Sequence, residues 1–189
     1  NIGAFFETHI EQGPILEDED TEIGVVRLGQ GIRWYNITCT GRESHAGTTP
    51  MHLRYDAMAT AALIVAEIEN IAHRNPPNGL GTVGFMEVYP NSRNTIPGTV
   101  KFSADLRNPD PDVLKGMDDQ LKSFCTQLAE KRNLEIEVDP FWYFAPVKFS
   151  ASENVKIAAQ NLGYSHMDIY AGAGHDACYM ADIVPSGMV

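Results

Sequence analysis

The chain has 189 residues, of which 43% are hydrophobic and 21% charged, a composition that is ordinary for globular proteins. That length is enough for one or two domains with buried cores. The formal net charge of −11 disfavours nucleic acid and anionic membranes as partners, because both reward a basic surface. The sequence shows neither an apolar run long enough to cross a bilayer nor the pattern of a secretory signal.

The cysteines predict the cellular compartment, and the two ends of the chain predict that it belongs to a longer protein. Cys39, Cys125 and Cys178 are spaced too widely and irregularly for a disulfide framework, so a reducing cytoplasm is the expected compartment. The chain starts with Asn1 rather than methionine and stops where an apolar run begins, so we expect it to be a piece of a longer protein.

The two ends of the chain predict short elements. Residues 3–18 should contain a strand end and a short helix, and residues 21–27 a strand rich in β-branched residues. Two glycines within residues 29–31 then predict a domain junction. Near the other end, residues 151–163 and 175–182 predict two helices.

Six segments between residues 32 and 139 show the periodicities of strands or amphipathic helices. In chain order they are the strand 32–40, the helix 56–73, the strands 82–89 and 99–106, a helix after Pro111 and the strand 134–138. The order β-α-β-β-α-β is that of the split βαβ, ferredoxin-like motif, in which both helices pack on one face of the sheet. The predicted fold class is therefore α/β in the mixed α+β sense, with a self-contained ferredoxin-like unit in the middle of the chain.

Two histidine motifs lie on either side of this unit. His9 stands in the segment 7–14 and His175 in the glycine-rich segment 172–177, each beside acidic residues. Imidazole and carboxylate groups suit zinc and related metals, and the glycines allow the backbone to approach a site closely. The residues alone leave structural roles open: His9 as a hydrogen-bonded histidine, and His175 as a solvated residue at a helix start.

Two loops within the ferredoxin-like unit carry further candidates. His45 lies in the segment 41–51, which is rich in small and turn-forming residues, and from such a loop a histidine can donate to a developing oxyanion. Asn94 lies in the polar segment 91–98, which joins two predicted strands. For both residues the alternative is a hydrogen bond within the turn of their own loop.

Arg107 ends the predicted strand 99–106, where a guanidinium can bind a carboxylate through two hydrogen bonds. An ion pair with Asp105 or Asp110 is the alternative. Cys178 has no histidine partner in its sequence context, so we do not expect a cysteine nucleophile. A nucleophile elbow, a phosphate-binding loop and a dinucleotide fingerprint are all missing from the sequence, so none of those chemistries is predicted.

Four segments together carry a resemblance to a known family. They are residues 9–14, 41–51, 91–98 and 172–177, in this order and almost from end to end of the chain. With them the chain resembles the M20-type metal-dependent amidohydrolases, in the branch that holds N-carbamoyl-L-amino-acid hydrolases, β-ureidopropionases and allantoate amidohydrolases. The resemblance implies an α/β catalytic domain with a two-metal site, into which a ferredoxin-like lid and dimerisation domain is inserted.

Applied to this chain, the resemblance implies catalytic-domain segments at 1–29 and 144–189 and a lid domain at 30–143. The implied reaction is hydrolysis of linear amide C–N bonds in N-carbamoyl amino acids (ureido acids) to amino acid, ammonia and carbon dioxide. Two divalent ions, usually zinc and sometimes manganese or cobalt, would activate the attacking water. The expected assembly is a homodimer formed through the lid domain.

The resemblance also assigns roles to six side chains. They are His9 and His175 as ligands of one metal ion each, His45 as stabiliser of the tetrahedral intermediate, Gln12 as part of the substrate pocket, and Asn94 and Arg107 as holders of the substrate, with Arg107 on its carboxylate. In this family the lid of one subunit can reach the site of its dimer partner. The three lid residues can therefore act in trans.

One part of the family's pattern is missing from this sequence. The histidine, the bridging aspartate and the Glu-Glu pair that complete the site in the family lie upstream of the His9 motif. We therefore expect the isolated chain to have little hydrolase activity and weak metal affinity. The alternatives for the parent protein are an allantoate amidohydrolase, an M20 peptidase and a non-catalytic lid or dimerisation module. The metal content of the full-length protein, about two ions per subunit or none, separates the enzyme from the module.

Overall fold

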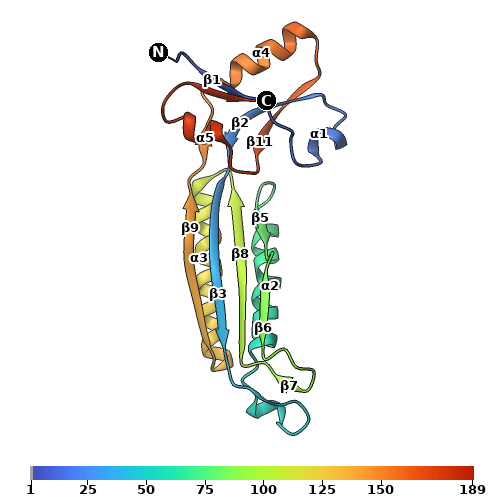
Figure 1. The fold of residues 1–189 in the computed structure, drawn as a ribbon, viewed down its shortest axis with the longest axis vertical. Helices are drawn as coiled ribbons and strands as arrows, with labels where there is room; N and C mark the ends of the chain where they lie inside the picture. The colour runs from blue at the N-terminus through green and yellow to red at the C-terminus, as the bar shows by residue number, and fades with distance from the viewer. Residues whose placement is uncertain (1) are drawn as a thin grey trace. The chain divides into compact units, whose positions relative to one another are not determined.

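The computed structural model describes residues 2–189 and divides into two compact units. The terminal unit consists of the residues up to Gly31 together with Ala145–Val189, and the central unit of Ile32–Phe144. The predicted domain limits at 29/30 and 143/144 fall within two residues of these boundaries. Each unit has its own sheet (Figure 1). In the described residues, no helix is both long and apolar enough to cross a membrane.

The terminal unit is built on a sheet of five short strands. Its elements are β1 (Phe5–Glu7), α1 (Ile15–Asp18), β2 (Ile23–Gly29), β10 (Val147–Lys148), α4 (Ser152–Leu162), β11 (His166–Ala171), α5 (Asp176–Met180) and β12 (Ser186–Met188). The strand order is β1-β12-β2-β10, and β11 also pairs with β2. Two pairings are parallel, β1 with β12 and β11 with β2, and both join segments far apart in the sequence.

Strand β2 is the buried middle of this sheet, because Val25 and Val26 are 0% and 3% exposed. Helix α4 packs against β2 and β12, and it ends at Gly163, whose φ of 77° is the left-handed conformation that glycine adopts most readily. The helix predicted at 151–163 is α4, whereas the helix predicted at 175–182 is the shorter α5. Strand β11 was not predicted; it exists because it pairs in parallel with β2.

The central unit has the ferredoxin-like topology predicted from the sequence. Its elements are β3 (Gly31–Thr40), β4 (Ser44–His45), the 3₁₀-helix η1 (Met51–Leu53), α2 (Ala57–His73), β5 (Leu80–Thr82), β6 (Met86–Tyr89), β7 (Thr95–Ile96), β8 (Thr99–Asn108), α3 (Pro111–Arg132) and β9 (Glu135–Phe144). In the large sheet β8 and β3 are central, β9 flanks β3, and β5 and β6 flank β8. The small strands β4 and β7 pair with each other.

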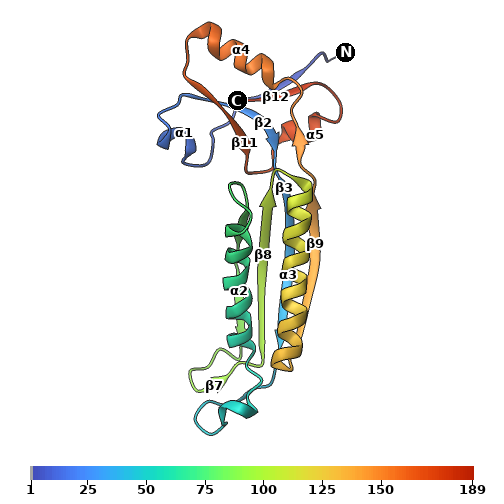
Figure 2. The ribbon, with the colours of Figure 1, turned by 180° about the vertical axis from the view of Figure 1, so that it is seen from behind.

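Helices α2 and α3 cover the same face of the large sheet, as Figure 2 shows. Their inward stripes match the helical spacing of the sequence and meet the inward side chains of β3 and β8. The largest fully buried side chains of this core are Tyr35, Ile37, Ile64, Ile68, Ile71, Val100, Phe102, Leu106, Leu114, Met117 and Leu121. The periodicity of the two helices and of β8 therefore predicted this core correctly.

The strand predicted at 82–89 is in fact two strands separated by a bulge. Thr82 pairs with Asp105 and Met86 with Phe102, so the three residues between Thr82 and Met86 oppose only two on β8. The extra residue interrupts the ladder, which is the usual effect of a β-bulge.

Strand β9 is longer than the predicted 134–138 and continues to Phe144. It continues through Pro140, which is tolerated because β9 lies at the edge of the sheet and Pro140 stands beside an irregularity in its pairing with β3.

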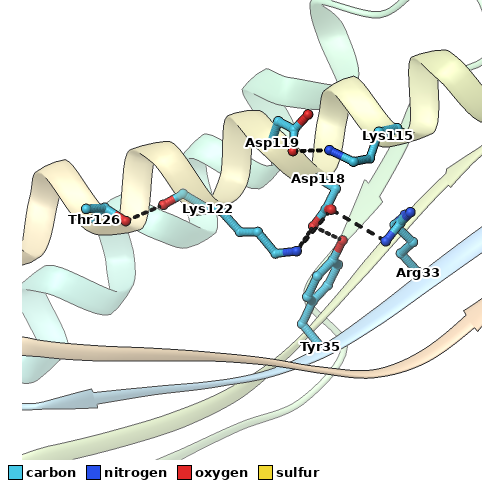
Figure 3. A network of polar contacts seen from close by, with 7 residues as sticks. All are labelled: Arg33, Tyr35, Lys115, Asp118, Asp119, Lys122 and Thr126. Carbon is cyan, nitrogen blue, oxygen red and sulfur yellow. Dashed lines mark hydrogen bonds and ion pairs between the residues drawn. The ribbon is translucent and has the colours of Figure 1, made fainter.

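A buried polar network fixes α3 on β3 (Figure 3). The side chain of Asp118 on α3 is 2% exposed, and its carboxylate accepts a hydrogen bond from the Tyr35 hydroxyl at 2.8 Å. Lys122 Nζ and Arg33 Nη1 approach the same carboxylate at 2.8 and 3.4 Å. Burial, together with the hydrogen bond to Asp118, raises the pKa of Tyr35. A buried carboxylate needs such partners, so this network ties the helix to one position on the sheet.

Candidate functional site

The pairing of β1 with β12 helps to bring the two predicted metal ligands together. Just beyond β1, the backbone N–H of His9 donates to the carbonyl oxygen of Val189 at 2.8 Å, and His175 directly precedes α5. The two rings lie edge to face, with centroids 4.6 Å apart and planes at 68°. The residues come from opposite ends of the chain, so their contact depends on the topology of the sheet.

The His9 ring is held by its own backbone. Its Nδ1 lies 2.6 Å from the carbonyl oxygen of Ile10. Because a carbonyl oxygen only accepts hydrogen bonds, Nδ1 carries a ring proton. A neutral ring of this tautomer presents the lone pair of Nε2, which is the form in which histidine binds a metal.

The His175 ring is buried beside a carboxylate. Its side chain is 7% exposed, and burial lowers the pKa of this histidine. Glu7, whose Oε1 lies 3.6 Å from Nδ1, acts in the opposite direction but does not reverse the shift. The ring is therefore uncharged near neutral pH, and an uncharged imidazole can bind a metal.

The turn that follows β1 is closed by Glu11. Its two carboxylate oxygens accept the backbone N–H groups of Ile15 and Leu16, each at 2.8 Å, and so bind the start of α1. Gln12 has a left-handed φ of 60°, which is costly for a residue with a side chain and is held by this turn. In the described chain, the residues lining the hollow around the histidine pair do not include Gln12. Its role in a substrate pocket stays a prediction.

The histidine pair offers only part of a two-metal site. Among residues 2–189, no group of three or more His, Cys, Asp or Glu side chains is arranged to hold a metal ion. The two rings nevertheless fit the role, because they touch each other and the Nδ1 of His9 is already occupied by a backbone partner. A metal site at this pair therefore needs further donors from outside the described residues.

Two other predicted residues meet at the β4–β7 ribbon of the central unit. His45 pairs with Thr95, and the N–H of Ala46 donates to the carbonyl oxygen of Asn94 at 2.9 Å. His45 and Asn94 are both exposed. The ribbon thus brings together two loops that are far apart in the sequence, next to the residue where β8 begins.

The His45 ring carries its proton on the opposite nitrogen from that of His9. The backbone N–H of Gly47 donates to His45 Nδ1 at 3.1 Å, so in the neutral ring Nε2 holds the proton. An exposed Nε2–H is a hydrogen-bond donor that an oxyanion can accept. The local geometry therefore suits the predicted role of His45.

Arg54, which was not predicted as a site residue, fixes the loop that carries this histidine. Its Nε donates to the carbonyl oxygen of Thr49 at 3.0 Å, and its Nη2 to that of Ala46 at 2.7 Å. At the start of the loop, a Cβ on Gly41 would lie 2.1 Å from the carbonyl oxygen of Tyr55, so only glycine fits there. The one available signal for Arg54 was its position just behind the loop.

Arg107 lies at the other end of β8. It pairs with Leu80, eight residues beyond Thr99, which is roughly 26 Å along an extended strand. Its Nε and Nη2 donate to the carboxylate of Asp105 at 2.9 and 2.6 Å, which is one of the two ion pairs considered as its alternative role. Arg107 and the β4–β7 ribbon are therefore too far apart to hold one small substrate within a single chain.

All three cysteines are free and buried. Burial raises the pKa of Cys39 to about 11 and that of Cys125 to about 12, and it also raises the pKa of Cys178. Thiols in this condition are protonated and inert at neutral pH. The structure therefore supports the prediction that Cys178 is not a nucleophile.

The chain is similar to several known proteins. Residues 1–189 match the family described as Peptidase family M20/M25/M40. An N-carbamoyl-L-amino-acid amidohydrolase of Rhizobium meliloti is 44% identical over 98% of this chain and 45% of its own length, and an allantoate amidohydrolase of Escherichia coli is 34% identical over 100% and 46%. A crystal structure of an amidase of the hydantoinase/carbamoylase family from Burkholderia multivorans superposes with a TM-score of 0.96 at 48% identity, covering 99% of this chain and 46% of that one. The chain thus spans less than half the length of these relatives.

Proposed function

Because the chain belongs to the Peptidase family M20/M25/M40, we propose that the full-length protein is a metal-dependent hydrolase of N-carbamoyl amino acids. It cleaves the linear amide C–N bond of the ureido group and releases the amino acid, ammonia and carbon dioxide. Two relatives named for this activity are 44% and 40% identical to the chain, whereas two named allantoate amidohydrolases are 34% and 32% identical. The observation that carries the proposal is the contact between the two imidazoles, with centroids at 4.6 Å.

In this proposal His9 and His175 hold two divalent ions through their Nε2 atoms, together with donors from the part of the protein beyond this chain. Zinc is the first candidate, and manganese and cobalt are the others. When bound, such ions supply an activated water and polarise the scissile carbonyl. The chain's own contribution is to hold the two rings in contact, with the proton of His9 on Nδ1.

The central unit supplies the substrate-binding groups. His45 donates from Nε2 to the oxygen that becomes negative as the carbonyl is attacked. Asn94, whose backbone is bonded to the same ribbon, holds the ureido group. Arg107 binds the carboxylate that every N-carbamoyl amino acid carries, and it exchanges or shares its present partner Asp105 to do so.

The length of β8 supports a site that is shared between two chains. Arg107 lies roughly 26 Å from the start of β8, and the ribbon with His45 and Asn94 lies beyond that start. We therefore propose a homodimer in which Arg107 of one subunit and the ribbon residues of the other act on the same substrate. The dimer forms through the central unit, whose edge strand β9 offers unpaired backbone groups.

A complementation experiment tests this arrangement. Full-length His45→Ala and Arg107→Ala chains, each with a different affinity tag, are co-expressed and the doubly tagged heterodimer is purified. If the two residues act from different subunits, one of the two sites is intact and the heterodimer has about half of the wild-type activity. If both act from the same chain, every site lacks one residue and the heterodimer is as inactive as the two parent variants.

Substrate assays test the reaction itself. The full-length protein is loaded with zinc, manganese or cobalt and supplied with N-carbamoyl-α-amino acids, N-carbamoyl-β-alanine, allantoate and dipeptides. We expect about two metal ions per subunit and the highest kcat/KM on an N-carbamoyl amino acid. A preference for allantoate or a dipeptide would contradict the substrate class, and a protein without metal or turnover would support a non-catalytic module.

The 189-residue chain alone should turn over little substrate, because among its described residues no three or more His, Cys, Asp or Glu side chains are grouped to hold a metal ion. Robust hydrolysis by this chain with added zinc would contradict that expectation. The reducing cytoplasm remains the proposed compartment, since the three free and buried cysteines need no oxidising environment.

A further inference from the structure

Glu7 lies beside His175, and the proposed function gives it no role. Its Oε2 accepts the backbone N–H of Ala177, in the first turn of α5, at 2.7 Å. Its Oε1 faces Nδ1 of His175 at 3.6 Å. The side chains of Glu7 and His175 are 18% and 7% exposed, so bulk water has little access to this contact.

The hydrogen bond to Ala177 fixes which way the carboxylate points. With one oxygen held by the helix, the other is directed to the Nδ1 edge of the imidazole. A carboxylate at that edge favours a proton on Nδ1, because an ionised carboxylate can only accept. With the proton on Nδ1, Nε2 of His175 keeps a free lone pair. This is the same tautomer that Ile10 imposes on His9.

We propose that Glu7 is the positioning residue of His175. It holds the proton on Nδ1 and the ring in place, so that Nε2 is presented to the metal ion. This inference rests on the proposed function and names a residue that acts through a ligand rather than as one. A carboxylate behind a ligating histidine is a recurrent arrangement in metal sites, and its loss usually weakens metal binding about 10–100-fold.

The deciding variant is Glu7→Gln in the full-length protein. The amide oxygen can still accept from Ala177, which leaves the NH₂ group directed at Nδ1 of His175. A donor at that position favours the opposite tautomer, with the proton on Nε2, where the metal should bind. Glu7→Gln therefore keeps the contact with the helix but favours the opposite tautomer of His175, whereas Glu7→Ala removes both contacts.

Two quantities are measured for each protein: zinc affinity by competition with a chelator, and the Tm of the metal-free form. We expect Glu7→Gln to bind zinc about 10–100-fold more weakly. Its metal-free Tm should fall by roughly 2 °C or less, since only the charge at the helix start is lost. Glu7→Ala should lose both zinc affinity and thermal stability.

Asp110→Asn is the matched control. Asp110 accepts the backbone N–H groups of Asp112 and Val113 at the start of α3, so it has the same capping role as Glu7 without a histidine beside it. We expect a small decrease in Tm and no change in zinc affinity. The control separates the effect of changing a charged helix cap from the effect of changing the tautomer of His175.

Three outcomes would overturn the inference. A Glu7→Gln protein that binds zinc as tightly as the wild type would show that the carboxylate does not position the ring. A Glu7→Gln protein whose metal-free Tm falls as far as that of Glu7→Ala would show a purely structural role. A wild-type protein that binds no metal would overturn the proposed function and this inference with it, whereas the first two results leave the proposed function intact.

Discussion

His9 in the terminal unit and His45 in the central unit are both fixed by a backbone group at Nδ1, but the hydrogen bonds run in opposite directions. Nδ1 of His9 donates to the carbonyl oxygen of Ile10, and Nδ1 of His45 accepts from the N–H of Gly47. The first ring offers a lone pair at Nε2 and the second offers an N–H. The neighbouring backbone group therefore decides whether an imidazole suits a metal or an oxyanion.

The two units also differ in how they build these positions. The contact between His9 and His175 depends on strands from both ends of the chain, and one of the two rings is buried. His45 lies exposed on a short ribbon that is held by nearby carbonyl groups and by Arg54. In the proposed enzyme the positions of the two metal-binding histidines, His9 and His175, are thus set by long-range strand pairing. The position of the hydrogen-bond donor His45 is set by a loop.

Removing either imidazole of the histidine pair should reduce the activity most. In the full-length protein, His175→Ala should lower kcat/KM by ~10³-fold or more and reduce the metal content from about two ions per subunit to about one. His9→Ala should act in the same way, since each ring is proposed to bind one ion. The checks are steady-state kinetics and elemental analysis.

His52→Ala is the control for these variants, because His52 is an exposed histidine in η1 of the central unit. It should keep the wild-type rate and metal content. A His175→Ala protein with two bound ions and a rate within tenfold of the wild type would refute the assignment of His175.

Removing the hydrogen-bond donor His45 should have a smaller effect on activity and should leave metal binding unchanged. His45→Ala should lower kcat about 10²–10³-fold without any change in metal content, because only the hydrogen bond to the developing oxyanion is lost. His45→Gln places an amide N–H near the original Nε2 position and should recover part of the rate. Loss of metal in His45→Ala would contradict this prediction, because it would show that His45 contributes to metal binding.

In the central unit, the buried network around Asp118 should matter for stability rather than for catalysis. Asp118→Ala should lower the free energy of unfolding by about 3 kcal/mol, because it leaves the Tyr35 hydroxyl and the Arg33 guanidinium without their buried partner. Asp119→Ala, at an exposed carboxylate paired with Lys115 on the same helix, should show no measurable change. Urea unfolding compares the two, and equal stabilities would contradict the role of the network drawn in Figure 3.

The smallest effect concerns the thiols of the same core. Burial raises the pKa of Cys125 to about 12, so between pH 9 and 10 the unfolded chain releases a proton that the folded chain keeps. Stability should therefore fall as the pH rises, and Cys125→Ala should reduce that slope by about 1.4 kcal/mol per pH unit. Urea unfolding at several pH values measures it, and an unchanged slope would show that the thiol ionises in the folded state.

The sequence predicted those parts of the fold in which the periodicity is local. Helices α2 and α3 and strand β8 have the predicted faces, since residues such as Ile64 and Ile68 repeat at the spacing of one buried stripe. The bulge after Thr82 and the strand β11 were missed because both depend on the partner strand. The pairing of two distant segments produces no repeating hydrophobic pattern that could be recognised in the sequence.

The candidate site follows the same division. The family resemblance selected His9 and His175, whereas the parallel pairing of β1 with β12 helps to explain how residues near opposite ends of the chain can meet. Glu7 was visible in the sequence two residues before His9, yet nothing there indicated that it faces His175. The role of Arg54 has no sequence signal of this kind either, because its partners are backbone carbonyl groups that any residue supplies.

A crystal structure of the full-length protein with zinc, with the metal located by its anomalous scattering, would test the proposed roles of the two histidines. We predict one zinc ion bonded to Nε2 of His9 and a second bonded to Nε2 of His175, with Ile10 and Glu7 still at the Nδ1 edges of the two rings. Zinc bonded through Nδ1 of either ring, or located away from both rings, would contradict the account.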